Sequence, residues 1–199
     1  EYHEALGVQS LEPSAGVVRG STAVTFTGIH FRRTSTFGCR FGSVVVQAEW
    51  LSDGRGFCST PSAPRFGFYQ FEVTSNGIDF SDSDLHFLFY EPVIIRSLHP
   101  SIAPASNGHT LVTVNVESPS LSSFSSWKCV FGDLTLSVPA VIISSEVLQC
   151  VAPMTTIREV PFLLTRNSQN LEGGKGHSFQ FIEDTTLLGL KPNSGLTEG

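Results

Sequence analysis

Hydrophobic and polar residues alternate with a period of two along several short stretches of the chain. In TAVTFT, residues 22–27, Val24 and Phe26 alternate with threonine, and LVTVNV, residues 111–116, repeats this arrangement. A period of two is expected of a half-buried β-strand. The pattern therefore predicts strands over both stretches.

A longer alternating stretch, FGFYQFEVTS at residues 66–75, runs into a turn signal. Its apolar residues fall on one side of an extended chain and its polar residues on the other. The apolar set is Tyr69, Phe71 and Val73, and the polar set is Gln70, Glu72 and Thr74. Asn76-Gly77 follows, a dipeptide favoured where the backbone needs a positive φ. We expect a strand that ends in a turn.

Further apolar runs, LHFLFY at 85–90 and VVVQAEW at 44–50, each predict one more strand. Turn residues separate these runs at the spacing typical of a β-sandwich. About six or seven short strands are expected in each stretch of ~90 residues, within the range of immunoglobulin-like sandwiches. The predicted fold class is all-β.

The chain repeats itself. SLEPSAG at 10–16, SLHPSIA at 97–103 and GLKPNSG at 189–195 share a Leu-x-Pro start, and their prolines recur at intervals of 87 and 92 residues. Four further blocks follow the first two starts in the same order: GSTAVTFTG with GHTLVTVNV, GCRFG with KCVFG, FCSTP with QCVAP, and HFLFYE with SFQFIE. Such self-similarity indicates an array of equivalent folded units.

The repeat predicts three parts of the chain: a first domain at 1–91, a second at 92–184, and the start of a third copy at 185–199. The connection FLFYEPVIIRSLHP contains no Gly/Ser linker, and Pro92 fixes φ. We expect a stiff junction, an end-to-end semi-rigid rod, and a chain that is a segment of a longer array.

Each of the two complete copies carries two cysteines. Cys39 and Cys58 are 19 residues apart, and Cys129 and Cys150 are 21 apart. The simplest pairing is one disulfide inside each copy, which would add ~3 kcal/mol of stability by the chain-entropy account. Persistent disulfides imply an oxidising compartment. The alternatives are four free, buried thiols, or a metal site, for which Cys-x₂-Cys spacing and a nearby histidine are missing.

The Phe-Gly after the first cysteine suggests a structural role for this motif. A strand would carry Phe37, Cys39 and Phe41 to one face, and Gly42 would permit a tight reversal into VVVQ. The motif is expected to cross-link and turn the chain rather than to react.

Composition narrows the class of partner. Hydrophobic residues make up 40% and charged residues 15%, with 16 Phe, 18 Gly and 11 Pro, which suits a turn-rich β protein. The net charge of −6 leaves no excess of Lys and Arg to neutralise phosphates, so no nucleic-acid partner is expected. No apolar stretch reaches the ~18 to 20 residues of a membrane span, so this segment should not contact a membrane directly. There is no Asn-x-Ser/Thr glycosylation signal.

These motifs together resemble a known family. The order Leu-x-Pro-x-x-G, G-x-T-x-V-T-F-x-G, C-x-F-G, C-x-x-P, S-N-G-x-D-F-S and F-x-F-Y is similar to the IPT/TIG domain, an immunoglobulin-like fold of the E-set type found in plexins and certain transcription factors. The resemblance implies tandem β-sandwich domains, as in plexin-, Met-receptor- and fibrocystin-like ectodomains. The second copy departs from the first: RNSQNLEGG from Arg166 replaces SNGIDFS, and ESPSLSSFSSW replaces the shorter loop after Gly28, which leaves its turn geometry open.

Motifs of catalysis are missing from the sequence. The sequence contains no Gly-x-Ser-x-Gly elbow, His-Glu-x-x-His pair or phosphate-binding glycine loop, so no enzyme activity, catalytic residue or cofactor is predicted. The histidines have no carboxylate or cysteine at ligand spacing; they are His3, His30, His86, His99, His109 and His177.

The remaining candidates are acidic, basic and aromatic. Asp79, Asp82 and Asp84 in DFSDSD could hold Ca²⁺, but the spacing lacks the glycine and distal glutamate of a calcium loop, and a solvated turn is favoured. Arg32 and Arg33 could meet an acidic partner, although exposed loop charges are usually solvated. Trp50 and Trp127 could stack on a sugar, although burial in a core is favoured.

Three functions follow from these observations. The first is a non-catalytic extracellular or cell-surface segment that acts as a rigid spacer and protein-interaction surface in an adhesion, receptor or filament protein. Its partners would be neighbouring IPT/TIG repeats of the same larger chain and other surface proteins. The second is an accessory carbohydrate-binding module of a secreted enzyme. The third is a dimerisation or DNA-contact domain of a transcription factor, which would require reduced cysteines and a basic edge.

Overall fold

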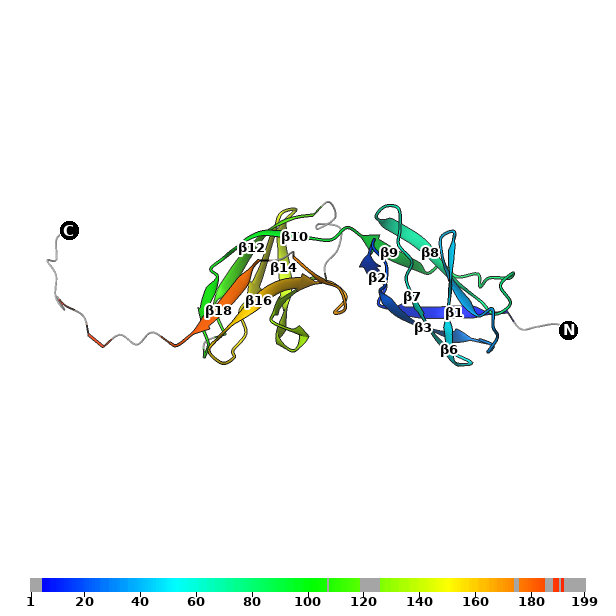
Figure 1. Ribbon diagram of the computed structural model, residues 1–199, viewed down its shortest axis with the longest axis horizontal. Helices are drawn as coiled ribbons and strands as arrows, with labels where there is room; N and C mark the ends of the chain where they lie inside the picture. The colour runs from blue at the N-terminus through cyan, green and yellow to red at the C-terminus, as the bar shows by residue number, and fades with distance from the viewer. Residues whose placement is uncertain are drawn as a thin grey trace.

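The computed structural model describes residues 5–106, 108–118, 126–173, 176–184, 188–189 and 191. Within these residues the regular structure is β, apart from a 3₁₀ turn at Leu134–Leu136, which confirms the all-β class. Figure 1 shows the strands gathered in two groups that follow one another along the long axis of the molecule. The predicted third copy at 185–199 lies almost wholly outside the described residues.

The first group of strands forms a sandwich of two sheets. Its strands are β1 (Gly7–Glu12), β2 (Ala15–Val17), β3 (Ala23–Ile29), β4 (Gly38–Phe41), β5 (Val44–Gln47), β6 (Glu49–Ser52), β7 (Arg55–Ser59), β8 (Gly67–Thr74) and β9 (His86–Tyr90). One sheet has the order β1-β3-β7-β6 and the other β2-β9-β8-β4-β5. We call this group the first sandwich.

The second group has the equivalent set of strands, and we call it the second sandwich. Its strands are β10 (Ile94–His99), β11 (Ile102–Pro104), β12 (Leu111–Glu117), β13 (Lys128–Phe131), β14 (Ser137–Ser144), β15 (Val147–Val151), β16 (Arg158–Thr165), β17 (Leu171–Glu172) and β18 (Ser178–Ile182). These strands form one continuous nine-stranded sheet in the order β10-β12-β15-β14-β13-β16-β18-β11, with β17 paired to β16, because β14 pairs with both β15 and β13.

Irregularities of the sheets recur at equivalent places. The β1–β3 ladder shifts register between Val8 and Ser10, and the β10–β12 ladder shifts between Ile95 and Ser97. In both sandwiches a short strand after the Leu-x-Pro segment pairs in parallel with the last strand, β2 with β9 and β11 with β18. The internal repeat is therefore a repeat of three-dimensional structure.

The segment VVVQAEW differs from its prediction as a single strand. It is divided at Ala48 into β5 and β6, because the chain crosses there from one sheet to the other. The Ala48 N–H donates to the carbonyl of Phe37 at 3.0 Å. In the second sandwich the equivalent Ala140 N–H donates to the carbonyl of Trp127 at 2.9 Å, but β14 continues through the crossing without a break.

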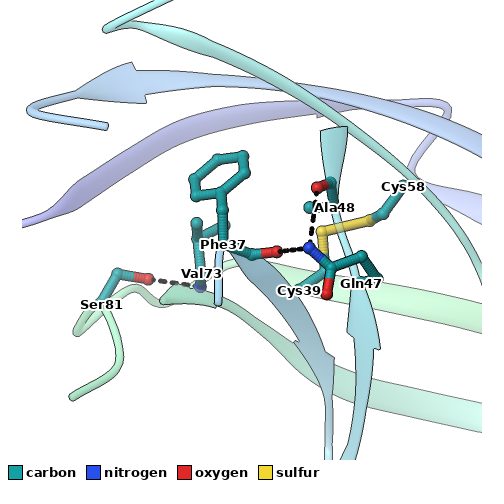
Figure 2. The surroundings of a disulfide bond; sticks show 7 residues. All are labelled: Phe37, Cys39, Gln47, Ala48, Cys58, Val73 and Ser81. Atoms are coloured by element: carbon teal, nitrogen blue, oxygen red, sulfur yellow. Dashed lines mark hydrogen bonds between the residues drawn. A yellow bond between two sulfur atoms is a disulfide. The ribbon is translucent and has the colours of Figure 1, made fainter. Parts of the chain in front are cut away.

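The disulfide Cys39–Cys58 joins β4 of one sheet to β7 of the other, with the two Cα atoms 6.6 Å apart. Figure 2 shows it beside Gln47, whose side-chain Nε2 donates to the carbonyl of Phe37 at 3.0 Å. Gly42 has a φ of 61°, and Phe41 pairs with Val44 across it, which confirms the expected reversal. Cys129 and Cys150 are joined in the same way in the second sandwich, with their Cα atoms 6.4 Å apart.

The core of the first sandwich is dominated by phenylalanine. Seven rings are buried there: Phe26, Phe31, Phe37, Phe41, Phe71, Phe87 and Phe89. Gly56 of β7 leaves room for the Phe26 ring, because a Cβ built at Gly56 would lie 2.3 Å from that ring. Aromatic edge contacts, such as Phe41 with Phe87 at 5.4 Å between centroids, then fill the space between the sheets.

Gly56→Ala should lower the free energy of unfolding by about 1–3 kcal/mol, because the added methyl group has to displace the Phe26 ring. Urea denaturation followed by fluorescence measures this. Ser59→Ala, at an exposed position of the same strand, serves as the control and should stay within about 0.5 kcal/mol of the unmodified protein. Equal effects of the two substitutions would contradict the packing role of Gly56.

Strand β8 departs from the half-buried pattern that its alternation suggests. From Phe71 to Thr74 both sides of the strand are buried. The reason is the segment after the turn, which runs back beside β8: the Ser81 hydroxyl accepts the Val73 N–H at 2.9 Å, as Figure 2 shows. Glu72 is buried in an ion pair with Arg40. Alternation alone does not reveal a second covering layer.

Candidate functional site

The loop after β16, residues 165–170, holds a tight turn that we call the junction loop. The Asn167 side-chain Oδ1 accepts the N–H groups of Gln169 at 3.0 Å and Asn170 at 2.8 Å. The Thr165 hydroxyl accepts the N–H of Ser168, whose φ is 56°. Because its own polar groups fix the backbone, the loop presents the side chains of Gln169 and Asn170 in set positions.

These side chains contact the end of the first sandwich, at Ala15, Thr22 and Ala23, which we call the junction edge. Gln169 makes two hydrogen bonds with the backbone of Ala23: its Oε1 accepts the N–H at 3.0 Å and its Nε2 donates to the carbonyl at 2.9 Å. Asn167 Nδ2 donates to the Ala15 carbonyl at 3.0 Å. The Thr22 hydroxyl donates to Asn170 Oδ1 at 2.9 Å. The junction loop thus extends the hydrogen bonding of the first sandwich as a short strand would.

Apolar packing lies beneath these hydrogen bonds. The core of the second sandwich includes four buried residues of the first: Ala15, Val17, Leu88 and Tyr90. The Tyr90 ring meets the ring of Trp127 edge to face, with the centroids 6.0 Å apart. The junction was expected to be stiff because of Pro92. The structure shows a further contact between the two sandwiches, which is a shared apolar interior.

A buried carboxylate holds the connecting segment. Glu172 is 4% exposed, and its Oε2 accepts the N–H of Val93 at 2.7 Å. Burial raises the pKa of Glu172 to about 7, although the Val93 N–H and the charges of Arg19 and Arg166 act in the opposite direction. Burial and the nearby Glu172 carboxylate also raise the pKa of Tyr90. Burial lowers the pKa of Arg166, whose guanidinium Cζ lies 5.2 Å from the centre of the Tyr90 ring.

Three buried polar atoms belong to residues of this junction. Among the described residues, the Tyr90 hydroxyl, Trp127 Nε1 and Glu172 Oε1 have no hydrogen-bond partner. The Tyr90 hydroxyl and the Glu172 carboxylate lie close enough that each shifts the pKa of the other. Buried polar atoms of this kind are costly unless they are satisfied.

The first sandwich carries the same turn at its opposite end, in residues 74–80, which we call the outer loop. Asn76 Oδ1 accepts the N–H groups of Ile78 at 2.9 Å and Asp79 at 2.8 Å. The Thr74 hydroxyl accepts the N–H of Gly77, whose φ is 76°. The two loops therefore share one geometry, which the differing sequences SNGID and RNSQN left open.

The outer loop borders a hollow of about 670 Å³ that is lined by Leu6, His30, Arg32, Asp79, Phe80 and Asp82, among others. Two of the three candidate calcium ligands, Asp79 and Asp82, lie here, and Asp84 does not. Asp79 Oδ2 accepts a hydrogen bond from Asn76 at 2.8 Å. Throughout the described part of the chain, no group of three or more His, Cys, Asp or Glu side chains is placed to hold a metal ion.

The other candidates are scattered. Arg32 lines the hollow, and its backbone N–H donates to Ser75. Trp127 is 3% exposed and cannot stack on a sugar. Trp50 packs against the core of the first sandwich, and its indole N–H donates to the Phe31 carbonyl at 3.1 Å. His177 contacts the Ile95 carbonyl at 2.9 Å through Nε2.

The patterns in the sequence do not single out the junction residues, although the sequence contains a signal for the turn. Thr74-Ser75-Asn76 and Thr165-Arg166-Asn167 both place Thr-x-Asn at the end of an equivalent strand. In each copy the threonine and the asparagine make the hydrogen bonds that fix the turn. The surface that the loop contacts cannot be predicted from the sequence, because Ala23 and Gln169 are 146 residues apart.

These observations define a pair of immunoglobulin-like β-sandwiches joined by a hydrogen-bonded and packed junction. Residues 7–89, essentially the first sandwich, match the model of the IPT/TIG domain family. The fold is also that of one solved ectodomain structure. The chain is 21% identical to a structure of the full extracellular region of plexin A4, domains 1 to 10, with a TM-score of 0.56, and the match covers 90% of this chain and 16% of that chain.

A second structure of the plexin A4 extracellular region, with domains 1 to 8, is 17% identical over 88% of this chain and 18% of that chain, with a TM-score of 0.49. The Escherichia coli adhesin FdeC is 12% identical over 93% of this chain and 67% of that chain, with a TM-score of 0.34. The chain thus spans less than a fifth of the length of the plexin structures it matches.

Two features bear on location. The two disulfides favour an oxidising environment outside the cell. Over the residues that the structure places, no helix is both long and apolar enough to cross a membrane.

Proposed function

We propose that this chain is a non-catalytic segment of an extracellular or cell-surface adhesion, receptor or filament protein, in which it acts as a rigid spacer and protein-interaction surface. Its domains would be residues 1–91 and 92–184, with 185–199 as the start of a further copy. The observation that carries the proposal is the junction loop, because Gln169 and Asn167 bind the backbone of the first sandwich directly.

The energetics support a fixed orientation. Four hydrogen bonds join the junction loop to the junction edge, each worth about 1 kcal/mol net. Apolar contacts of Tyr90 with Trp127 add to them. Independent domains joined by a flexible linker lack such contacts, and their relative orientation varies. A spacer requires the opposite, since reach depends on a constant angle between neighbours.

The experiment compares the relative orientation of the two sandwiches in solution with and without the hydrogen bonds between the junction loop and the junction edge. Residual dipolar couplings of the unmodified chain should fit one alignment tensor shared by both sandwiches. Gln169→Ala removes the two hydrogen bonds with Ala23 without touching the turn itself, so it should make the two tensors diverge. Asn115→Ala, which removes another exposed amide, controls for the loss of a surface amide and should leave a single tensor.

Two separate tensors in the unmodified chain would show that the junction does not fix the angle, and would refute the spacer. The paired cysteines count against the transcription-factor alternative, which needs free thiols. The buried position of Trp127 counts against a glycan site built on that residue.

A further inference from the structure

Each end of the molecule repeats one half of the junction. The outer loop of the first sandwich has the geometry of the junction loop, since Asn76, Ile78 and Asp79 occupy the positions of Asn167, Gln169 and Asn170. Strand β8 runs antiparallel to β9, whose end at Tyr90 lies in the junction. The outer loop therefore lies at the end of the first sandwich that faces away from the second.

The far end of the second sandwich repeats the other half. Ile102, Thr110 and Leu111 occupy the positions of Ala15, Thr22 and Ala23, and we call them the outer edge. The strand pairings give this equivalence: Ala15 lies beside Leu88 of β9 as Ile102 lies beside Gln180 of β18. Ala23 and Leu111 both begin the strand that pairs with the second cysteine of their own sandwich.

Two positions that contact each other at the junction carry polar and small residues there, and both carry large apolar residues at the two ends. At the junction, polar Gln169 binds the backbone of small Ala23. At the ends, Ile78 is 80% exposed and Leu111 is 52% exposed. Docking the outer loop on the outer edge in the geometry of the junction would therefore bury two exposed apolar side chains against each other. Ile102, also part of the outer edge, is 46% exposed.

The polar groups also correspond. Asn76 would donate to the Ile102 carbonyl as Asn167 donates to Ala15, and the Thr110 hydroxyl would donate to Asp79 as Thr22 donates to Asn170. An Asp carboxylate accepts such a bond at least as well as an Asn amide oxygen. Both halves of a complementary interface are thus present on one chain, at opposite ends.

We infer that the outer loop binds the outer edge of a second copy of this chain, so that copies associate head to tail. The inference deepens the proposed function and rests on it, because it applies the junction geometry between chains. The contact is heterologous, so one copy keeps a free loop and the other a free edge, and growth does not stop at a dimer. Within one chain the same contact is favoured by covalent linkage, whereas between chains it has to pay the cost of association.

The test is sedimentation velocity of the full chain from micromolar to millimolar concentration. The average mass should rise with concentration and pass that of a dimer. Ile78→Asp and Leu111→Asp should each weaken association by about ten- to a hundredfold, because each places a charge at the apolar contact. Val141→Asp, at a position that is 62% exposed in the middle of β14, is the matched control and should associate like the unmodified chain.

Mixing the two variants provides the sharpest measurement. Ile78→Asp keeps a good outer edge and Leu111→Asp keeps a good outer loop, so an equimolar mixture should form dimers that do not grow further. Three results would overturn the inference: no association of the unmodified chain at millimolar concentration, no dimer in the mixture, or equal weakening by Val141→Asp. None of them changes the dipolar couplings of the dilute chain, so the spacer proposal is tested separately.

Discussion

Replacing Cys129 and Cys150 by alanine should lower the free energy of unfolding of the second sandwich by about 3 kcal/mol. The disulfide closes a loop of 21 residues between β13 and β15, and both cysteines are buried in the core. Losing the cross-link widens the range of conformations open to the unfolded chain. The effect should exceed that of most surface substitutions several times over.

The two tryptophans allow this loss to be assigned to one sandwich. Trp127 is buried in the core of the second sandwich, and Trp50 packs against the core of the first. In a Trp50→Phe background, fluorescence during urea denaturation therefore reports the second sandwich alone. Cys39→Ala with Cys58→Ala in the same background is the control, and it should move the Trp127 transition much less. Equal shifts from the two pairs would show that both sandwiches unfold as one unit.

Intact mass tests the premise of that experiment. Reduction should add the hydrogens of two disulfides to the untreated protein. An unchanged mass after reduction would mean that the four cysteines are free thiols, which is the alternative that the sequence alone left open.

The repeat explains why much of the fold could be predicted from sequence. Alternation located β3 and β12, and the two pairs of cysteines lie at equivalent positions because each links the same two strands of its sandwich. The same rule failed for β8, since Glu72 and Thr74 are covered by a segment that returns beside the strand. Alternation of apolar and polar residues predicts that one face of a strand is buried. It does not predict whether another segment covers the polar face.

The junction could not be predicted in the same way. The turn in RNSQN depends on the Asn167 side chain, and its use depends on which backbone groups of the first sandwich remain unpaired. Both the N–H and the carbonyl of Ala23, at the start of β3, form hydrogen bonds with Gln169. The sequence TAVTFT does not indicate that these two backbone groups are free to bind another part of the chain. Contacts between units are set by backbone geometry, which a comparison of side chains between copies does not capture.

Glu172 should make the stability of the second sandwich depend on pH. Its pKa is raised from 4.5 to about 7 in the folded protein by burial. Between these values the unfolded chain has released a proton that the folded protein still holds, so stability falls as pH rises. The contribution of Glu172 to the free energy of unfolding is fully present below pH 4.5 and is lost as the pH passes 7. It amounts to about 3 kcal/mol, at 1.36 kcal/mol for each pKa unit.

Glu172→Gln isolates this contribution, because the amide oxygen can still accept the Val93 N–H but the side chain does not titrate. The free energy of unfolding should be measured by urea denaturation at pH 4.5, 6 and 8 in the Trp50→Phe background, with Trp127 as the reporter. The variant should gain about 3 kcal/mol relative to the unmodified protein between the lowest and the highest pH, since other carboxylates act equally in both proteins. Glu159→Gln, at an exposed position on β16, controls for the loss of one charge. A difference between Glu172→Gln and the unmodified protein that stays constant with pH would show that the pKa of Glu172 is not raised in the folded protein.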